Sequence, residues 1–117
     1  MAKVYFGFAV ADSMFGDEEL TISRSSIDVE AVQYLVRKGV IPCLNPSHAA
    51  TIAAMRNKFG LDVDIPEKAP QVALDVGDRL IVMSVRGLPR LDASRHEYTE
   101  SEIDAATFKF SIWEVLE

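Results

Sequence analysis

The sequence of 117 residues predicts an α/β fold, a single compact domain in which a mixed β-sheet is flanked by two or three helices. Residues 4–10 and 80–85 are apolar on both faces and rich in β-branched or aromatic residues, as in strands at the centre of a sheet. Between these two strands, helix-start and helix-stop residues bracket two segments that are predicted to be helices. A chain of this length buries one core and hardly two, so we expect residues 1–117 to form one domain.

A short strand and a first helix are predicted after the N-terminal strand. Residues 20–23 have strand composition, and Ser25 or Ser26 can cap the helix that follows. This helix carries acidic residues first and basic residues last, which suits the helix dipole, and it runs to about Lys38. Gly39 is the expected helix stop.

A second helix is predicted after a short strand. Residues 40–44 have strand character, and the proline among them limits this strand to an edge or to a strand start. Ser47 is a candidate N-cap for a helix that runs to about Phe59, with Gly60 as its stop. This assignment places His48 in the first turn of the helix.

The second half of the chain predicts further strands. Residues 61–65 and 71–74 are candidate strands around a proline-containing loop, and residues 80–85 form the second central strand. A capping box predicts a short helix over residues 99–106. Residues 107–113 alternate with period two, which indicates a half-exposed last strand.

Charge and hydropathy exclude several classes of partner. The net charge of −6 argues against a general DNA-binding or RNA-binding protein, because such affinity comes mainly from basic residues that neutralise phosphates. No apolar stretch is long enough for a membrane span, and the N-terminus lacks a signal-peptide pattern, so we expect a cytoplasmic protein. A short anionic ligand remains compatible with four arginines that lie within seventeen positions: Arg79, Arg86, Arg90 and Arg95.

The common metal and cofactor motifs are absent from the sequence. Two histidines far apart and one cysteine give no metal-ligand spacing, so we expect no metal and no cofactor. Phosphate-binding loops, dinucleotide-binding glycine patterns and the nucleophile elbow of hydrolases are also missing. Cys43 lies among apolar residues and is expected to be a small buried side chain rather than a reactive thiol.

His48, Arg86 and Arg90 are the candidate catalytic residues. A helix N-terminus attracts anions and keeps an imidazole close to its titrating range, so His48 can protonate a leaving oxyanion. An exposed or capping histidine is the structural alternative. Arg86 and Arg90 flank the end of a buried strand and can clamp a phosphate, or they can be solvated or paired with Asp92 or Glu97.

Three short motifs carry a resemblance to a known family: residues 47–51 (SHAAT), 77–82 (GDRLIV) and 87–89 (GLP). With them, the order of elements from residue 3 to residue 115 resembles the small ring nucleases of viruses and bacteria that were first described as type III anti-CRISPR proteins. The resemblance implies a two-fold homodimer whose shared pocket binds cyclic tetra-adenylate and linearises it without a metal.

The family resemblance also assigns roles to individual residues. It makes His48 the general acid, and Arg90 or Arg86 the residue that stabilises the scissile phosphate. The further ligand contacts are expected from Ser13, Ser47, Thr51 and Ser84, together with the two arginines. The acidic residue that the family carries just after the Leu-Pro pair is replaced here by Arg90 and Leu91. The alternative is therefore a protein that binds a cyclic nucleotide without cleaving it, or a dimeric regulator.

Overall fold

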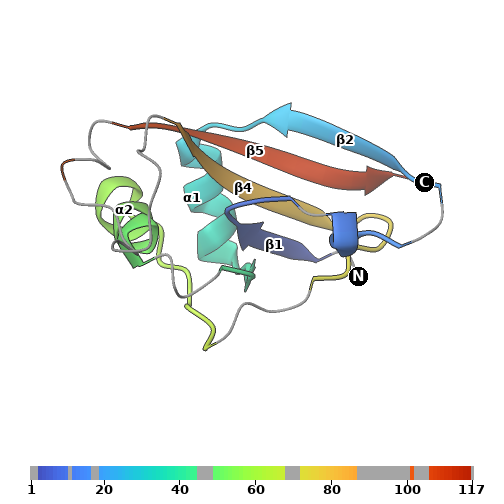
Figure 1. Cartoon of the computed structure of the whole chain (residues 1–117), viewed down its shortest axis with the longest axis horizontal. Coiled ribbons are helices and arrows are strands. Elements are labelled where there is room, and N and C mark those ends of the chain that lie inside the picture. Colours follow the sequence, from blue (N-terminus) through green and yellow to red (C-terminus); the bar gives the residue numbers. More distant parts are fainter. Residues whose placement is uncertain are drawn as a thin grey trace, which may run out of the picture.

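A five-stranded mixed sheet forms the centre of the computed structural model, which describes residues 3–10, 12–16, 19–44, 49–67, 72–86, 101 and 106–116. The elements are β1 (Val4–Gly7), the 3-10 helix η1 (Asp12–Met14), β2 (Thr21–Ser26), α1 (Val29–Lys38), β3 (Ile41–Pro42), α2 (Ala49–Phe59), β4 (Arg79–Arg86) and β5 (Thr107–Leu116). The strand order is β2-β5-β4-β1-β3 (Figure 1). β1 is parallel to both β3 and β4, whereas β5 is antiparallel to β4 and β2. The expected α/β fold with a mixed sheet is confirmed.

The two strands predicted as central are both interior strands. β1 pairs with β3 on one side and β4 on the other, and β4 pairs with β1 and β5. Phe6 and Ile81 are register partners in these strands, and both side chains are fully buried. β1 is shorter than the apolar run that predicted it, because the chain bends at Phe8.

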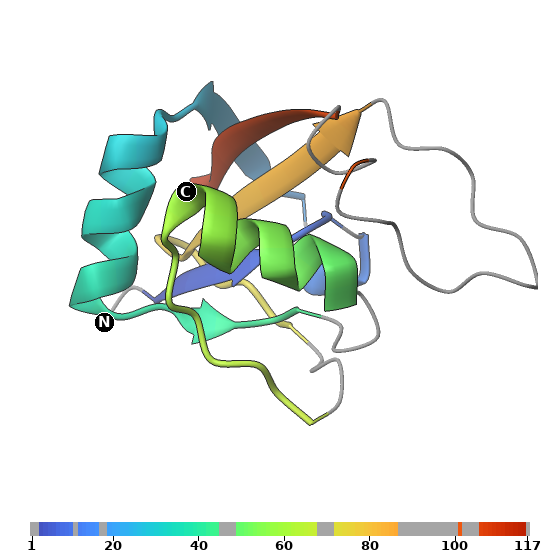
Figure 2. The ribbon, with the colours of Figure 1, turned by 90° about the vertical axis from the view of Figure 1, so that its left-hand side faces the viewer.

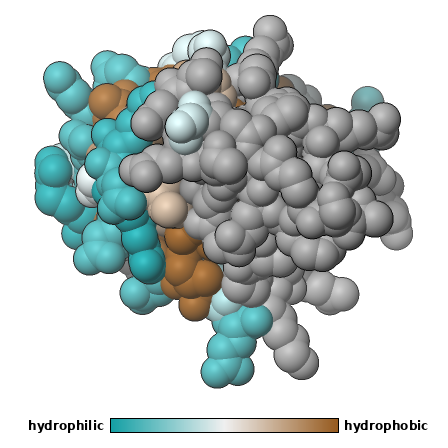
Figure 3. All heavy atoms as spheres, turned by 60° about the vertical axis from the view of Figure 1, so that its left-hand side comes forward, coloured by the Kyte–Doolittle hydropathy of each residue, from teal (hydrophilic) through white to brown (hydrophobic). Residues whose placement is uncertain are grey.

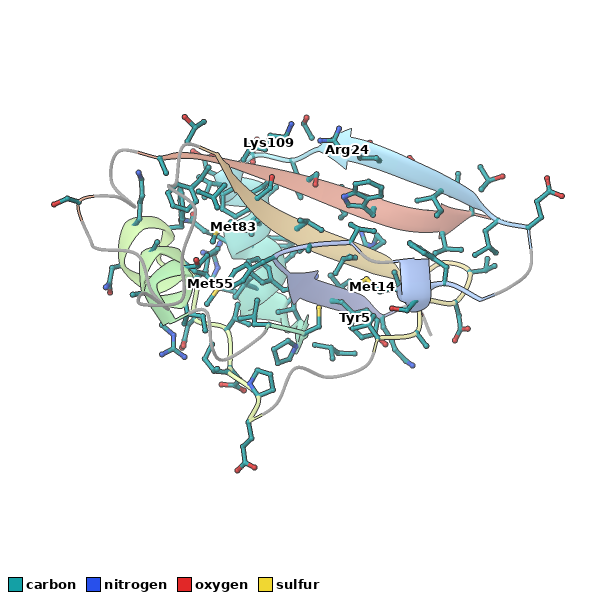
Figure 4. The ribbon with its side chains drawn as sticks, viewed as in Figure 1. Tyr5, Met14, Arg24, Met55, Met83 and Lys109 are labelled. Carbon is teal, nitrogen blue, oxygen red and sulfur yellow. The ribbon has the colours of Figure 1, made fainter. Side chains whose placement is uncertain are left out.

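Each face of the sheet carries its own hydrophobic cluster. One cluster joins Met83 of β4 to α1 and α2 through Val32 and Met55. The other contains Tyr5 and packs against Met14 and residues 72–74. Figure 4 shows Met55 and Met83 toward the α2 end of the molecule, and Tyr5 and Met14 toward the opposite end. Both helices therefore contribute to one cluster, and irregular chain covers part of the other face.

The first helix begins later than the sequence predicts. Ser25 and Ser26 belong to β2, where they pair with β5, and Asp28 is the N-cap. Its carboxylate accepts a hydrogen bond from the backbone N–H of Ala31 at 2.8 Å. The strand continues through the two serines because they pair with Ile112 and Ser111 of β5. The predicted stop at Gly39 is confirmed: it has φ 114°, and its N–H donates to the last carbonyls of α1.

Two predicted strands are absent from the described residues. Residues 61–65 and 72–74 have no regular secondary structure and pair with no strand there. Leu61 and Val63 are buried while the residues next to them are exposed, so the alternation reflects packing on the core rather than a ladder. The guanidinium of Arg56 donates to the Val63 carbonyl at 3.2 Å, which holds this segment against α2.

The last part of the chain is partly outside the described residues. The predicted helix at 99–106 falls mostly there. β5 extends the predicted last strand to Leu116 and pairs with both β4 and β2.

None of the helices in the described ranges has both the length and the apolar character that crossing a lipid bilayer requires.

Gly7 lies in close contact with Cys43, and we expect Gly7→Ala to destabilise the fold. A Cβ at Gly7 would lie 2.7 Å from the Sγ of Cys43, and this thiol is fixed by a hydrogen bond to the Phe6 carbonyl at 3.1 Å. Overpacking of this kind costs about 1–3 kcal/mol of unfolding free energy, which urea denaturation measures.

A double variant and a control separate this contact from the general effect of replacing glycine. Cys43→Ala removes the sulfur, so it should restore most of the stability lost in Gly7→Ala. A Cβ at the exposed Gly16 would meet no atom within 4 Å, and Gly16→Ala should change stability by less than about 1 kcal/mol. Equal losses in the two glycine variants would contradict the contact.

Candidate functional site

The parallel strands end on the side of the molecule where α2 begins. β1 and β4 run toward the end of the sheet at which α2 lies (Figure 1), and Figure 2 shows the start of α2 on the same side as the end of β4. The carboxyl ends of strands are where open α/β sheets commonly bind ligands, and a helix N-terminus favours anions. This end of the sheet is the candidate functional site.

Two predicted site residues contribute backbone to this end. Thr51 lies in the first turn of α2 and is half-buried. Arg86 is the last residue of β4 and pairs with Thr107 of β5. The side chain of Arg86 and the whole of Ser47, His48 and Arg90 lie outside the described residues, so their predicted roles stay predictions.

Ser84 is near the end of β4, and its side chain lies on the face that carries Val82. The preceding residue, Met83, points to the opposite face and belongs to the cluster that contains the helices. Its hydroxyl donates to the carbonyl of Lys109 at 3.3 Å, across the β4–β5 pair. Ser84 and the buried residues of α2 are thus associated with different faces of the sheet.

Ser13 lies far from α2. It belongs to η1, which Figure 1 places toward the opposite end of the long axis, and its side chain is exposed. The carbonyl of the next residue, Met14, accepts a hydrogen bond from the backbone of Leu74 at 2.7 Å. A polar residue that follows a strand in sequence can therefore return along the sheet instead of staying at the strand end.

Residues 45–48 are bounded on both sides by fixed chain. Before them, the Cys43 N–H donates to the Phe6 carbonyl at 2.9 Å, and Leu44 is fully buried. After them, Ile52 and Met55 of α2 pack into the core. The residues on both sides of the segment that carries the predicted general acid are therefore anchored to the core.

The motif at residues 77–82 has a structural role. Asp78 is 3% exposed, and its carboxylate accepts hydrogen bonds from the backbone N–H groups of Lys3 and Asp75, both at 2.9 Å. Gly77 has φ 89°, a conformation that favours glycine, and its N–H donates to Val115. The pair therefore ties the start of β1 and the end of β5 to the turn before β4.

Lys58 is a positive charge near the end of β4 that is not among the residues predicted from the sequence. Its Nζ lies 5.0 Å from the ring centroid of Phe108 and 6.0 Å from that of Phe59. Phe108 is the register partner of Val85, next to the last residue of β4. The sequence signal for this contact is a lysine next to a phenylalanine at a helix end, together with a phenylalanine-rich last strand.

Cys43 is expected to react slowly with alkylating reagents in the native protein. Burial raises the pKa of its thiol from 9.0 to about 11. The thiolate is the nucleophile, so at pH 8 the native protein should react with iodoacetamide about 100-fold more slowly than the urea-unfolded chain. Because the native state holds this proton more tightly than the unfolded chain does, the unfolding free energy should not depend on this thiol below pH 9. It should fall as pH rises from 9 toward 11. Equal alkylation rates in the two states would show that the thiol is accessible and unperturbed.

A hollow of about 480 Å³ lies between α1 and the chain after α2. Its lining residues are Gln33, Val36, Arg37, Gly60 and Asp62, none of which the sequence predicts to be functional. The Gln33 amide donates to the Phe59 carbonyl at 2.8 Å, so one of its polar groups already has a partner. Figure 3 shows the described residues on this side of the molecule as mainly hydrophilic, with small separate hydrophobic areas.

In the described part of the chain, no three metal-ligating side chains lie close enough together to hold a metal ion.

The fold resembles that of a viral protein. The sequence matches no protein family and no curated protein. Among solved structures, B116 of Sulfolobus turreted icosahedral virus superposes with a TM-score of 0.62 and 20% sequence identity, over 99% of this chain and 100% of that one. At this identity the likeness concerns the fold alone. The chain therefore shares its α/β fold, over essentially its whole length, with a small viral protein.

Proposed function

We propose that this chain is a metal-independent ring nuclease, which binds a cyclic oligoadenylate and linearises it. The ligand that we expect is cyclic tetra-adenylate. Its effect is to damp type III CRISPR signalling in the cytoplasm. The observation that carries the proposal is the motif at residues 47–51, which puts His48 directly before Ala49, the first residue of α2. The shared fold with a viral protein supports a small viral-type protein of this kind.

The proposed reaction is a transesterification within the ligand. A ribose 2′-oxygen attacks the adjacent phosphorus, its proton passes to water, and the bond from phosphorus to the 5′-oxygen breaks. His48 gives its proton to the leaving 5′-oxygen, which leaves a 2′,3′-cyclic phosphate and a free 5′-hydroxyl. Arg90 or Arg86 and helix N–H groups stabilise the charge on the phosphate, commonly the largest contribution in such sites.

Arg90→Ala or Arg86→Ala is expected to weaken both ligand binding and cleavage. A guanidinium that clamps a phosphate acts in the ground state as well as in the transition state, so the dissociation constant should rise and the single-turnover rate should fall. Arg37→Ala on α1 is a matched control, because this exposed arginine lies on the first helix and outside the proposed site. An arginine variant with unchanged binding and rate is not the phosphate clamp.

The proposed pocket requires a two-fold homodimer, because the family pocket lies between two subunits. We expect light scattering at micromolar concentration to give twice the mass of the chain. A monomer under these conditions would count against a shared pocket and against the ring-nuclease proposal.

A protein that only binds the cyclic nucleotide, or a dimeric regulator, is the second candidate. Replacement of the acidic residue after the Leu-Pro pair by Arg90 favours this candidate, and His48 disfavours it. Labelled cyclic tetra-adenylate is incubated with the protein in EDTA and then recovered by denaturation. Linear products support the nuclease. Intact ligand that co-purifies with the protein supports the binding protein. Absence of any binding contradicts the nuclease and the nucleotide-binding protein, and leaves the dimeric regulator.

A further inference from the structure

β2 is an edge strand whose outer side has no strand partner in the described part of the chain. It is last in the strand order and pairs only with β5. Five of its six residues are exposed, and Ser23 is half-buried. Figure 1 shows β2 along the border of the sheet.

The hydrogen-bond pattern identifies the backbone groups that point outward. Ile27 donates to the Phe110 carbonyl, and these residues continue the β2–β5 register. Bonded pairs alternate in an antiparallel ladder, so residues 21, 23 and 25 face β5, and residues 22, 24 and 26 present N–H and C=O groups outward. On the other side of β5, Val115 donates to the Asp78 carbonyl, which agrees with this alternation.

This edge has little of the usual protection against strand pairing. Natural edges are commonly blocked by proline, by bulges, by short length or by inward charges. β2 contains no proline, and its register with β5 is continuous over all six residues. Arg24 is its single charged residue.

The strands carry basic but no acidic side chains on the face around Arg24, although the chain carries a net charge of −6. The strand residues of β2, β5 and β4 on this face include no Asp or Glu: Ile22, Arg24, Ser26, Lys109, Ser111, Trp113, Val115, Leu80, Val82 and Ser84. Arg24 and Lys109 extend from this part of the sheet in Figure 4.

Arg24 is held in position by Trp113. The guanidinium carbon lies 5.7 Å from the ring centroid, and the indole N–H donates to the Ser111 hydroxyl at 3.0 Å, which fixes the ring. Within the described ranges, no carboxylate pairs with Arg24. The ring contact favours this position of the guanidinium, and its N–H groups remain available to an acceptor.

We propose that β2 is a docking edge for an extended acidic segment of a partner protein, which adds to the sheet as a sixth strand. Cross-strand neighbours share a face, so an acidic side chain opposite Arg24 pairs with the guanidinium, and an apolar side chain two residues away meets Ile22. Ile22 is 37% exposed and offers this apolar contact. A second copy of this chain fits less well. If two β2 strands paired so that their Arg24 side chains lay on the same face of the joined sheet, the two positive charges would come together without an acid.

The test uses a capped seven-residue peptide of alternating threonine and valine with a central glutamate, and a twin with a central lysine. Both are titrated into the isotope-labelled full chain and followed by NMR. The glutamate peptide should bind about threefold to tenfold more tightly than the lysine peptide. When it is bound, the amide protons of Ile22, Arg24 and Ser26 should exchange at least about tenfold more slowly.

Two variants test the charge and the backbone separately. Arg24→Glu should reverse the preference between the peptides. Ser26→Pro removes an outward N–H without touching the ladder to β5, so it should weaken both peptides about twofold to tenfold. Thermal unfolding confirms that each variant folds, and if one does not, the comparison of the two peptides on the unaltered chain decides.

Several outcomes would overturn the proposal. Equal affinity for the two peptides, or binding that leaves the three outward amides unprotected, would show that β2 is no acidic-strand edge. Protection of these amides that rises with protein concentration alone would assign the edge to a second copy. Absence of binding would leave Arg24 as a charge that keeps the edge solvated.

Discussion

His48→Ala is expected to lower the rate of cyclic tetra-adenylate cleavage about 10²–10⁴-fold, the usual contribution of general acid–base catalysis. Ligand affinity should stay nearly unchanged, since binding depends on arginines and backbone N–H groups. Single-turnover cleavage and equilibrium binding, both measured in EDTA, separate the two quantities. A general acid must begin protonated, so the rate of the parent protein should also fall as pH rises above the range in which histidine carries its proton.

His96→Ala is the matched control for this experiment. His96 is the other histidine of the chain and lies in a charged stretch, where a surface position is the simpler interpretation. We expect it to cleave at the parental rate. If His48→Ala also cleaves at the parental rate in EDTA, His48 has no catalytic role, and the enzyme proposal loses the residue on which it depends.

The sequence predicted the sheet better than it predicted the element boundaries. The apolar segments of β1 and β4 and the glycine stops of both helices could be recognised locally, because burial and backbone conformation select those residue types. The start of α1 could not. Ser26 and Asp28 are equally good caps in isolation, and only the pairing of β2 with β5 decides between them.

The candidate site was only partly predictable for the same reason. Thr51 and the end of β4 lie at the expected end of the sheet, since strand direction and helix polarity follow from the order of elements. Ser13 followed β1 closely in sequence, but the chain reverses after Gly7 and carries it away. The alternation at residues 61–65 resembles a strand, although a segment packed on the core without a ladder gives the same pattern.

Asp78→Asn is expected to be among the most destabilising single substitutions in this chain. The carboxylate accepts one backbone N–H from the start of β1 and one from the turn before β4. An amide replaces one acceptor oxygen by a donor that faces an N–H, so one buried backbone group loses its partner. The cost is about 1–3 kcal/mol of unfolding free energy, and Asp78→Ala, which removes both acceptors, should cost about 2–5 kcal/mol.

Asp75→Asn is the control, because this side chain is three residues away in the same turn and is exposed. Its effect should stay within about 0.5 kcal/mol in urea denaturation, since the turn uses only the backbone groups of Asp75. Hydrogen exchange gives a second readout. Loss of the bond between Asp78 and Lys3 should release the start of β1, so the substitution should accelerate exchange of the β1 amides more than exchange of the β2 amides that face β5. If the two asparagine variants are equally stable, the turn is held by its backbone bonds alone, and the buried carboxylate does not stabilise the junction between β1, β4 and β5.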